Sequence, residues 1–201
     1  MDVERFLREL PEQLEDVSAF AEILDDVPGL ATPNTLALLN VAVRCLGPGE
    51  HYVEVGTLRG TSLISAARGN DGELVAIDSF AMEGGSREQL ERNLERHGVR
   101  ATILEGDAFE TLRAGIPAPV GAYYYDAAHG YEQQLEGMRL AEPYLASPAL
   151  VIVDDTDWER VERAVDDYLA AQPRATEIFR VDGKDRGSPE WWEGMRVLRW
   201  D

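Results

Sequence analysis

A short glycine-containing segment between two apolar runs constrains this chain more than any other feature. Residues 51–55 form an apolar, strand-like run, and residues 54–60 (EVGTLRG) lead from it into a helical pattern. A second apolar run ends at Asp78, 22 positions after Gly56. In an α/β sheet, such a turn lets the backbone approach a ligand closely, and an acid about 20 residues on accepts hydrogen bonds from ribose hydroxyls. The pattern predicts a site for an adenosine-containing cofactor.

The rest of the chain predicts an α/β fold with a Rossmann-like, doubly wound sheet of seven strands. Strands are expected near residues 51–55, 73–78, 101–105, 121–126, 149–154, 177–181 and 195–200. Helices are expected near residues 60–68, 86–97, 107–114, 130–145 and 157–172. Residues 86–89 (SREQ) and 156–159 (TDWE) are both typical of capping boxes at a helix start. This alternation predicts a mostly parallel sheet with helices on both faces. The short connection between the last two strands predicts an antiparallel hairpin at the end of the sheet.

The length predicts a single domain spanning residues 1–201, with residues 48–201 as the cofactor-binding core. Residues 1–47 are expected to form N-terminal helices. Apolar residues recur at helical spacing over residues 3–25, although Pro11 could split or kink that helix. The apolar faces of these helices could form a substrate lid or a homodimer contact.

Charge and cysteine content exclude several classes of protein. The net charge of −19 argues against nucleic acid or an anionic membrane as a partner, because both are polyanions. The single cysteine, Cys45, excludes an intrachain disulfide and a multi-cysteine metal site. The acidic N-terminus does not resemble a signal peptide, and no apolar run approaches transmembrane length. We expect a cytoplasmic protein.

The only lysine, Lys184, narrows the enzyme class. Asp185 follows it, so a phosphate-binding loop of the Gly-Lys-Ser/Thr type is excluded. Position 180 is an arginine, so a Tyr-x-x-x-Lys dehydrogenase pair is also missing. Residues 56–60 lack the G-x-G-x-x-G spacing. These observations disfavour a nicotinamide oxidoreductase, although it would share the sheet and the ribose acid.

Acidic residues fall at the predicted strand ends, where ligands bind in sheets of this kind. Asp78 follows the second strand and is a candidate for ribose binding; the alternative is a solvated turn carboxylate. Asp107, within residues 105–108 (EGDA), is a candidate for adenine contact. It could equally cap the next helix, and the two roles are compatible.

Three further acids form a second group. Asp126 ends the fourth strand, and Asp154 and Asp155 end the fifth. They would repel one another unless a positive group lies between them, and Mg²⁺ prefers carboxylate oxygens. A metal there could lower the pKa of a substrate hydroxyl, with Asp126 as general base. The alternative is that Asp155 caps the following helix and backbone amides satisfy Asp154.

Four aromatic residues are candidates for a ligand-binding site at the same edge of the sheet. His129 follows Asp126 by three positions on a loop, and neutral imidazole is the usual general base near pH 7. It could instead be a structural histidine that bonds a backbone carbonyl. Trp158, Trp191 and Trp192 could wall an acceptor pocket or pack in the core and at the hairpin edge. Trp158 is the best pocket candidate because it follows the Asp154–Asp155 pair closely.

These residues resemble the class I S-adenosylmethionine-dependent methyltransferases over about residues 33–200. Residues 54–60 are similar to the first motif of that superfamily, in which an acid precedes a glycine turn that holds the methionine part of the cofactor. Asp78 matches the ribose-binding acid, and residues 105–108 match the adenine-contacting motif. The resemblance implies a cofactor-binding set of Glu54, Gly56, Thr57, Gly60, Thr61, Asp78, Ser79, Asp107, Ala108 and Asp126.

The most similar subgroup is the small bacterial O-methyltransferases related to the macrocin and aminocoumarin-sugar enzymes, and more distantly the catechol and caffeoyl-CoA type. Residues 125–131 (YDAAHGY) resemble their Asp-Gly-x-His-x-Tyr segment, and residues 153–158 (VDDTDW) resemble their metal-binding segment. By this likeness Mg²⁺ would be held by Asp126, Asp154 and Asp155. Ala127 departs from the usual glycine, and no long insertion supplies an acceptor lid, so the acceptor stays open.

The leading hypothesis is a Mg²⁺-dependent O-methyltransferase that acts on a small hydroxylated molecule, with Asp126 and His129 as catalytic residues. One alternative is a metal-free methyltransferase that uses His129 or Asp126 as base. The other is a protein that binds an adenosine cofactor without turnover.

Overall fold

Seven strands form one sheet in the order β3-β2-β1-β4-β5-β7-β6 in the computed structural model, which describes residues 1–201. The strands are β1 (His51–Val55), β2 (Glu73–Asp78), β3 (Thr102–Glu105), β4 (Val120–Tyr125), β5 (Leu145–Asp154), β6 (Ala175–Val181) and β7 (Met195–Trp200). Strands β1 to β5 run parallel, while β7 is antiparallel to both β5 and β6. The predicted doubly wound sheet with its C-terminal antiparallel hairpin is confirmed.

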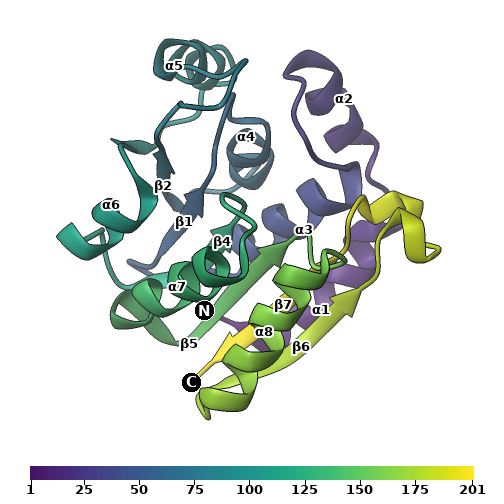
Figure 1. Cartoon of the computed structure of the whole chain (residues 1–201). Helices are drawn as coiled ribbons and strands as arrows, with labels where there is room; N and C mark the ends of the chain where they lie inside the picture. Colours follow the sequence, from purple (N-terminus) through teal and green to yellow (C-terminus); the bar gives the residue numbers. More distant parts are fainter.

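Helices cover both faces of this sheet (Figure 1). The α-helices are α1 (Val3–Leu14), α2 (Ser18–Asp26), α3 (Pro33–Arg44), α4 (Thr61–Ala67), α5 (Arg87–Arg96), α6 (Ala108–Ala114), α7 (Tyr131–Ala141) and α8 (Glu159–Ala171). Helices α1 to α5 share one apolar core with one face of the sheet, and α6 to α8 share a second core with the other face. None of the helices is both long and apolar enough to cross a membrane.

The alternation of side chains along β4 shows how a strand serves both cores. Tyr123 and Tyr125 belong to the core under α6 to α8, whereas Tyr124 belongs to the core under α1 to α5. Successive side chains of a strand point to opposite faces, which explains this division. All three rings are fully buried. The Tyr124 hydroxyl nevertheless reaches the carboxyl end of the sheet, where the candidate site lies.

Two local predictions about the helices need correction. The helix expected over residues 3–25 is two helices, and the break lies after Leu14 instead of at Pro11, which stays inside α1. The Asp16 carboxylate explains the break, because it accepts hydrogen bonds from the backbone N–H and the hydroxyl of Ser18 and so starts α2. The capping box expected at residues 156–159 is also wrong.

Contacts with the C-terminal hairpin explain why the capping box at residues 156–159 does not form. Helix α8 has Trp158 as its N-cap residue, with no side-chain cap bond. The Thr156 and Asp157 N–H groups donate instead to the carbonyls of Gly194 and Glu193, in the connection between β6 and β7. By contrast, the capping role expected for Ser86 at the start of α5 is confirmed. The segment after β5 is therefore held by the C-terminal hairpin.

The order of the strands reverses between β1 and β4, and the carboxyl ends of these two strands adjoin at that point. Ligands of open α/β sheets bind in the crevice at such a switch point. Gly56, directly after β1, has a φ of +91°, and a Cβ atom placed there would lie 1.8 Å from the Asp126 carbonyl oxygen. Only glycine lets the two strand ends approach this closely.

Candidate active site

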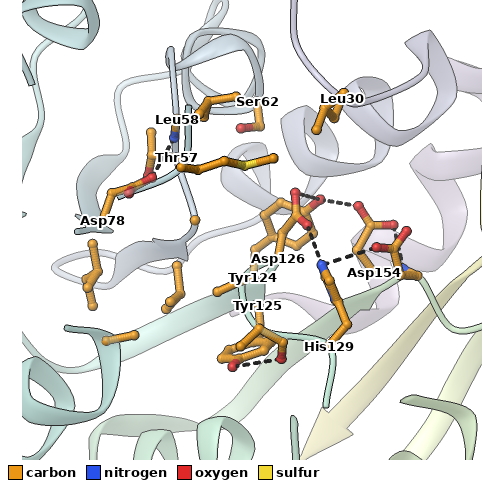
Figure 2. Close-up of a pocket in the computed structure, with 18 of the residues that line it drawn as sticks. Leu30, Thr57, Leu58, Ser62, Asp78, Tyr124, Tyr125, Asp126, His129 and Asp154 are labelled. Carbon is orange, nitrogen blue, oxygen red and sulfur yellow. Dashed lines mark hydrogen bonds and ion pairs between the residues drawn. The ribbon is translucent and has the colours of Figure 1, made fainter. Parts of the chain in front are cut away.

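A cavity of about 540 Å³ opens at the carboxyl ends of β1, β2, β4 and β5. Its lining comes from the turn after β1, the segments after β2, β3, β4 and β5, the connection between α2 and α3, and the connection between β6 and β7. Figure 2 shows Asp126, Asp154 and His129 converging inside it. The predicted site residues that line the cavity are Gly56, Thr57, Thr61, Asp78, Ser79, Asp107, Ala108, Asp126, His129, Asp154 and Asp155.

Asp78 fastens the glycine turn to the end of β2. One carboxylate oxygen accepts a hydrogen bond from the Leu58 N–H at 2.7 Å, and the other accepts from the Phe80 N–H at 2.7 Å. Each oxygen keeps a second lone pair, so the carboxylate can still accept a hydroxyl from a ligand in the cavity. Asp78 is therefore an ordered part of the cavity wall, and the alternative of a solvated turn carboxylate is not what the structure shows.

Asp107 caps a helix and also lines the cavity, so its position fits both roles that the sequence predicts. Its Oδ1 accepts hydrogen bonds from the N–H groups of Phe109 at 2.9 Å and Glu110 at 3.0 Å, which makes it the N-cap of α6. The same residue lines the cavity together with Ala108. Because capping uses only one carboxylate oxygen, the other is free to meet a ligand.

Two predicted residues lie behind the cavity wall. Glu54 is fully buried, and it accepts hydrogen bonds from the hydroxyls of Tyr52 and Ser62, each at 2.7 Å. Burial raises the pKa of its carboxyl to about 7. Ser62 does line the cavity, so Glu54 supports the wall through it. Gly60 starts α4 with a φ of +88°, and a side chain there would collide with Leu90.

The acids at the ends of β4 and β5 are linked by a tyrosine. The Tyr124 hydroxyl donates to Asp154 Oδ2 at 2.6 Å and lies 3.2 Å from Asp126 Oδ2. The Asp155 N–H donates to Asp154 Oδ1 at 3.0 Å. Burial raises the pKa of Asp154 and of Asp155 to about 6 and raises that of Asp126 well above its ordinary value, and neighbouring acids add to each shift.

His129 completes this cluster from the loop after β4. Its Nε2 lies 3.2 Å from Asp155 Oδ2 and 3.9 Å from Asp126 Oδ1. Burial lowers the pKa of the imidazole, so the ring is neutral near pH 7. Its Nδ1 is buried without a hydrogen-bond partner, and the ring packs edge-on against Trp158 at 5.2 Å between ring centroids. The expected alternative, a bond to a backbone carbonyl, is absent.

One ligand atom each from Asp126, His129 and Asp155 lie within 4.8 Å of one another, close enough to share a divalent cation. The sequence reasoning put Asp154 in this group instead of His129. Asp155 has a φ of +54°, a left-handed conformation that no local pattern indicates, and its side chain meets His129. Asp154 lies beside the three, with its oxygens engaged by the Tyr124 hydroxyl and the Asp155 N–H.

Several residues that line the cavity were not predicted from the sequence. Tyr124 looked like an ordinary core residue of a strand, and nothing local marks its hydroxyl as the link between two acids. Arg59 and Ser62 follow the glycine turn and could have been found from that position alone. Residues 29–31, before α3, also line the cavity. Of the three candidate tryptophans, Trp158 and Trp192 line it, whereas Trp191 is buried against Phe179.

Solved structures that are similar to this chain over most of its length include O-methyltransferases. An O-methyltransferase from Bacillus cereus, solved with S-adenosylhomocysteine, is 19% identical with a TM-score of 0.68, over 96% of this chain and 91% of that one. The O-methyltransferase TomG from Streptomyces achromogenes, solved with S-adenosylmethionine, is 24% identical with a TM-score of 0.62, over 92% and 88%. A Staphylococcus aureus protein assigned to the caffeoyl-CoA O-methyltransferases is 18% identical with a TM-score of 0.68, over 100% of both chains.

The sheet order, the glycine turn and the strand-end acids define a class I S-adenosylmethionine-dependent methyltransferase. Residues 53–156 match the family model described as a methyltransferase domain. This match covers just over half of the chain, and the chain belongs to that family. The comparison with curated proteins finds no match.

Proposed function

We propose that this methyltransferase transfers the methyl group to a hydroxyl oxygen of a small molecule and that Mg²⁺ supports the reaction. One observation carries the proposal: Asp126, Asp154, Asp155 and His129 converge at the ends of β4 and β5, inside the cavity onto which the glycine turn opens. A carboxylate cluster beside a cofactor turn suits the removal of a proton from an alcohol or phenol.

The cavity residues fit S-adenosylmethionine, which supplies an activated methyl group when bound. Asp78 would receive the ribose hydroxyls with its remaining lone pairs, next to Ser79. Asp107 and Ala108 would contact the adenine. The methionine part would lie along Gly56, Thr57, Thr61 and Asp126, with Glu54 and Gly60 behind the wall. These four residues line the cavity, which supports this placement.

The acidic cluster fits a hard divalent cation. Three carboxylates whose pKa values are raised by burial and mutual repulsion are stabilised when a cation joins them. Asp126, Asp155 and either Asp154, as the sequence predicts, or His129, which lies as close, would hold Mg²⁺, and the ion would lower the pKa of a hydroxyl close to it. If Asp154 is the third ligand, the neutral His129, 3.2 Å from Asp155, would orient that carboxylate.

The roles of the protein side chains follow from their places. Asp126 lies where the ends of β1 and β4 adjoin, so it stands between the cofactor turn and the remaining part of the cavity. It would remove the hydroxyl proton as the acceptor oxygen takes up the methyl group. The cavity walls hold acceptor and cofactor in line, which is the main demand of a transfer whose methyl group is already activated.

A metal-free variant of the same reaction is the second candidate. His129 favours it, because a neutral imidazole with an unpartnered, buried Nδ1 can accept a proton. Sensitivity to a chelator separates the two. The N-terminal region also contributes to the site: residues 29–31 line the cavity, which supports the proposal that this region acts as a lid.

Calorimetric titration with S-adenosylhomocysteine, once with Mg²⁺ and once with EDTA, tests the proposal. We expect micromolar binding in both buffers, since Asp126 is the only proposed cofactor residue that would also hold the metal. Methyl transfer to a hydroxylated acceptor should stop in EDTA and return with Mg²⁺. Absence of S-adenosylhomocysteine binding would overturn the assignment of the cofactor site, and transfer that persists in EDTA would favour the metal-free variant.

A further inference from the structure

The exposed large apolar side chains of this protein gather at the candidate site. Five such side chains are more than a third exposed: Leu30 and Met82 at 58% each, Trp158 and Trp192 at 39% each, and Leu7 at 37%. All of them except Leu7 line the single cavity described above. They come from four different connections, so no one amphipathic helix accounts for them. Apolar side chains exposed together around a cavity mark a surface that binds an apolar partner.

The charges of the lining are almost entirely negative. Arg59 is its only arginine, and its guanidinium donates to the carbonyls of Gly84 at 2.6 Å and Pro28 at 3.1 Å. The only lysine, Lys184, is near the Trp192 ring but is paired with Glu193. The acids of the lining are Asp78, Asp107, Asp126, Asp154 and Asp155. Even with a divalent cation bound, this lining stays net negative and repels an anionic acceptor.

Trp192 is held at the cavity by the C-terminal hairpin. Its φ is +55°, a conformation that costs energy for a bulky residue and persists only where the surroundings impose it. The Asp157 carboxylate accepts a hydrogen bond from the Gly183 N–H at 2.8 Å, and the Asp157 N–H donates to the Glu193 carbonyl at 2.8 Å. These bonds tie the connection that carries Trp192 to the segment that carries Trp158.

The size of the cavity limits the acceptor as well. A volume of about 540 Å³ must take both the cofactor and the acceptor, which leaves space for a molecule of one or two rings. Two tryptophans offer a large, rigid apolar surface on which a flat ring packs well.

We propose that the methyl acceptor is an uncharged ring compound that bears a hydroxyl group and packs against Trp158 and Trp192, and that Trp192 determines this specificity. The inference rests on the proposed O-methyl transfer and names its substrate class. It excludes acceptors with an anionic tail, such as a coenzyme A thioester, and acceptors as polar as a sugar.

A matched pair of probes isolates the effect of charge. Methyl 3,4-dihydroxybenzoate and 3,4-dihydroxybenzoate carry the same ring and hydroxyls, but only the second carries a carboxylate. With S-adenosylmethionine and Mg²⁺, we expect kcat/KM for the ester to exceed that for the acid by about tenfold or more. Equal or better use of the acid would overturn the proposal.

Variants test the role of Trp192. Trp192→Ala should raise KM for the ester about tenfold and change kcat little, because it removes ground-state packing and leaves the acid cluster intact. Trp192→Phe should restore most of the loss. Leu7→Ala, which removes the one exposed large apolar side chain outside the cavity, is the control and should leave KM unchanged. If Trp192→Ala and Leu7→Ala behave alike, Trp192 does not determine specificity.

Binding separates this inference from the proposed function. The ester and the acid are titrated into protein saturated with S-adenosylhomocysteine, with tryptophan fluorescence as the readout. Ester binding without methyl transfer would support the acceptor class and overturn O-methylation. No ester binding, together with methylation of a polyol such as myo-inositol, would overturn the acceptor class and retain O-methylation. No binding of either ester or acid would overturn the acceptor class as well.

Discussion

The Tyr124 hydroxyl donates a hydrogen bond to Asp154 Oδ2 at 2.6 Å and lies 3.2 Å from Asp126 Oδ2, so one residue of β4 links the acids at the ends of two strands. The register of β4 and β5 explains this link. Tyr124 is paired with Ile152, so each of the two acids lies two residues farther along its own strand. The hydroxyl holds the two carboxylates at a defined separation, which a shared cation requires.

Replacement of Tyr124 by phenylalanine tests that link. The change removes only the hydroxyl, so the ring should still fill its place in the core. We expect kcat to fall about tenfold or more because the two carboxylates lose their common partner, with S-adenosylhomocysteine affinity retained. The free energy of unfolding should fall by about 1–3 kcal/mol, as expected when a buried acceptor loses its donor. An unchanged kcat would show that the hydroxyl does not position the acids.

The close approach at Gly56 predicts a large effect of a single methyl group. Gly56→Ala would place a Cβ atom 1.8 Å from the Asp126 carbonyl oxygen and force the ends of β1 and β4 apart. We expect a loss of about 2–4 kcal/mol in the free energy of unfolding and loss of S-adenosylhomocysteine binding, measured by urea unfolding and calorimetry.

A matched control separates collision from backbone strain. Gly49 has a similar φ of +76°, but a Cβ atom there would meet nothing within 4 Å. Gly49→Ala should therefore cost only about 1 kcal/mol, the strain of a left-handed alanine, and leave cofactor binding intact. Equal losses for both variants would mean that strand approach at Gly56 is not the cause.

Glu54 predicts a pH dependence of stability. Burial raises its pKa from the ordinary value of 4.5 to about 7, so the folded state holds the proton more tightly than the unfolded chain does. Its contribution is therefore most favourable below pH 4.5 and is lost as pH rises to about 7, by about 3 kcal/mol in all.

Glu54→Gln isolates this contribution, because the amide does not ionise. Urea unfolding in EDTA at about pH 5 and about pH 8 should show a smaller loss of stability with rising pH in the variant than in the wild type. The acids at the ends of β4 and β5 titrate in the same direction in both proteins, and the variant changes only the smaller contribution of the Glu54 charge to the pKa of Asp126. Identical losses in the two proteins would rule out a raised pKa at Glu54.

The geometry around His129 predicts that substitutions in the acid cluster lower the Mg²⁺ affinity by different amounts. Asp155→Asn removes a carboxylate of the cluster and should lower Mg²⁺ affinity about a hundredfold or more in calorimetry. His129→Gln removes the imidazole that lies 3.2 Å from Asp155 and should lower that affinity by only about tenfold. Asp107→Asn, an acid of the same cavity outside the cluster, is the control. If His129→Gln abolishes binding while Asp154→Asn does not, the histidine is itself a ligand in place of Asp154.

Much of the fold was predictable because its signals are local. The apolar runs that became β1 and β2, and the serine that caps α5, act through the residues next to them. The break before α2 and the start of α8 were predicted wrongly, the second because Thr156 and Asp157 bond to the distant hairpin. Local patterns cannot report a competition between a nearby partner and a remote one.

Strand periodicity and chain order were enough to predict the class of sheet, the glycine turn at Gly56 and the positions of Asp78, Asp107, Asp126 and Asp154 at strand ends. Which groups meet depends on the folding of distant segments onto one another: the Tyr124 hydroxyl lies between two acids, His129 lies against Asp155, and Trp192 lines the cavity. Those contacts join residues from different strands and loops. They depend on register, on a left-handed Asp155 and on the docking of the hairpin, and no spacing along the chain encodes such distances.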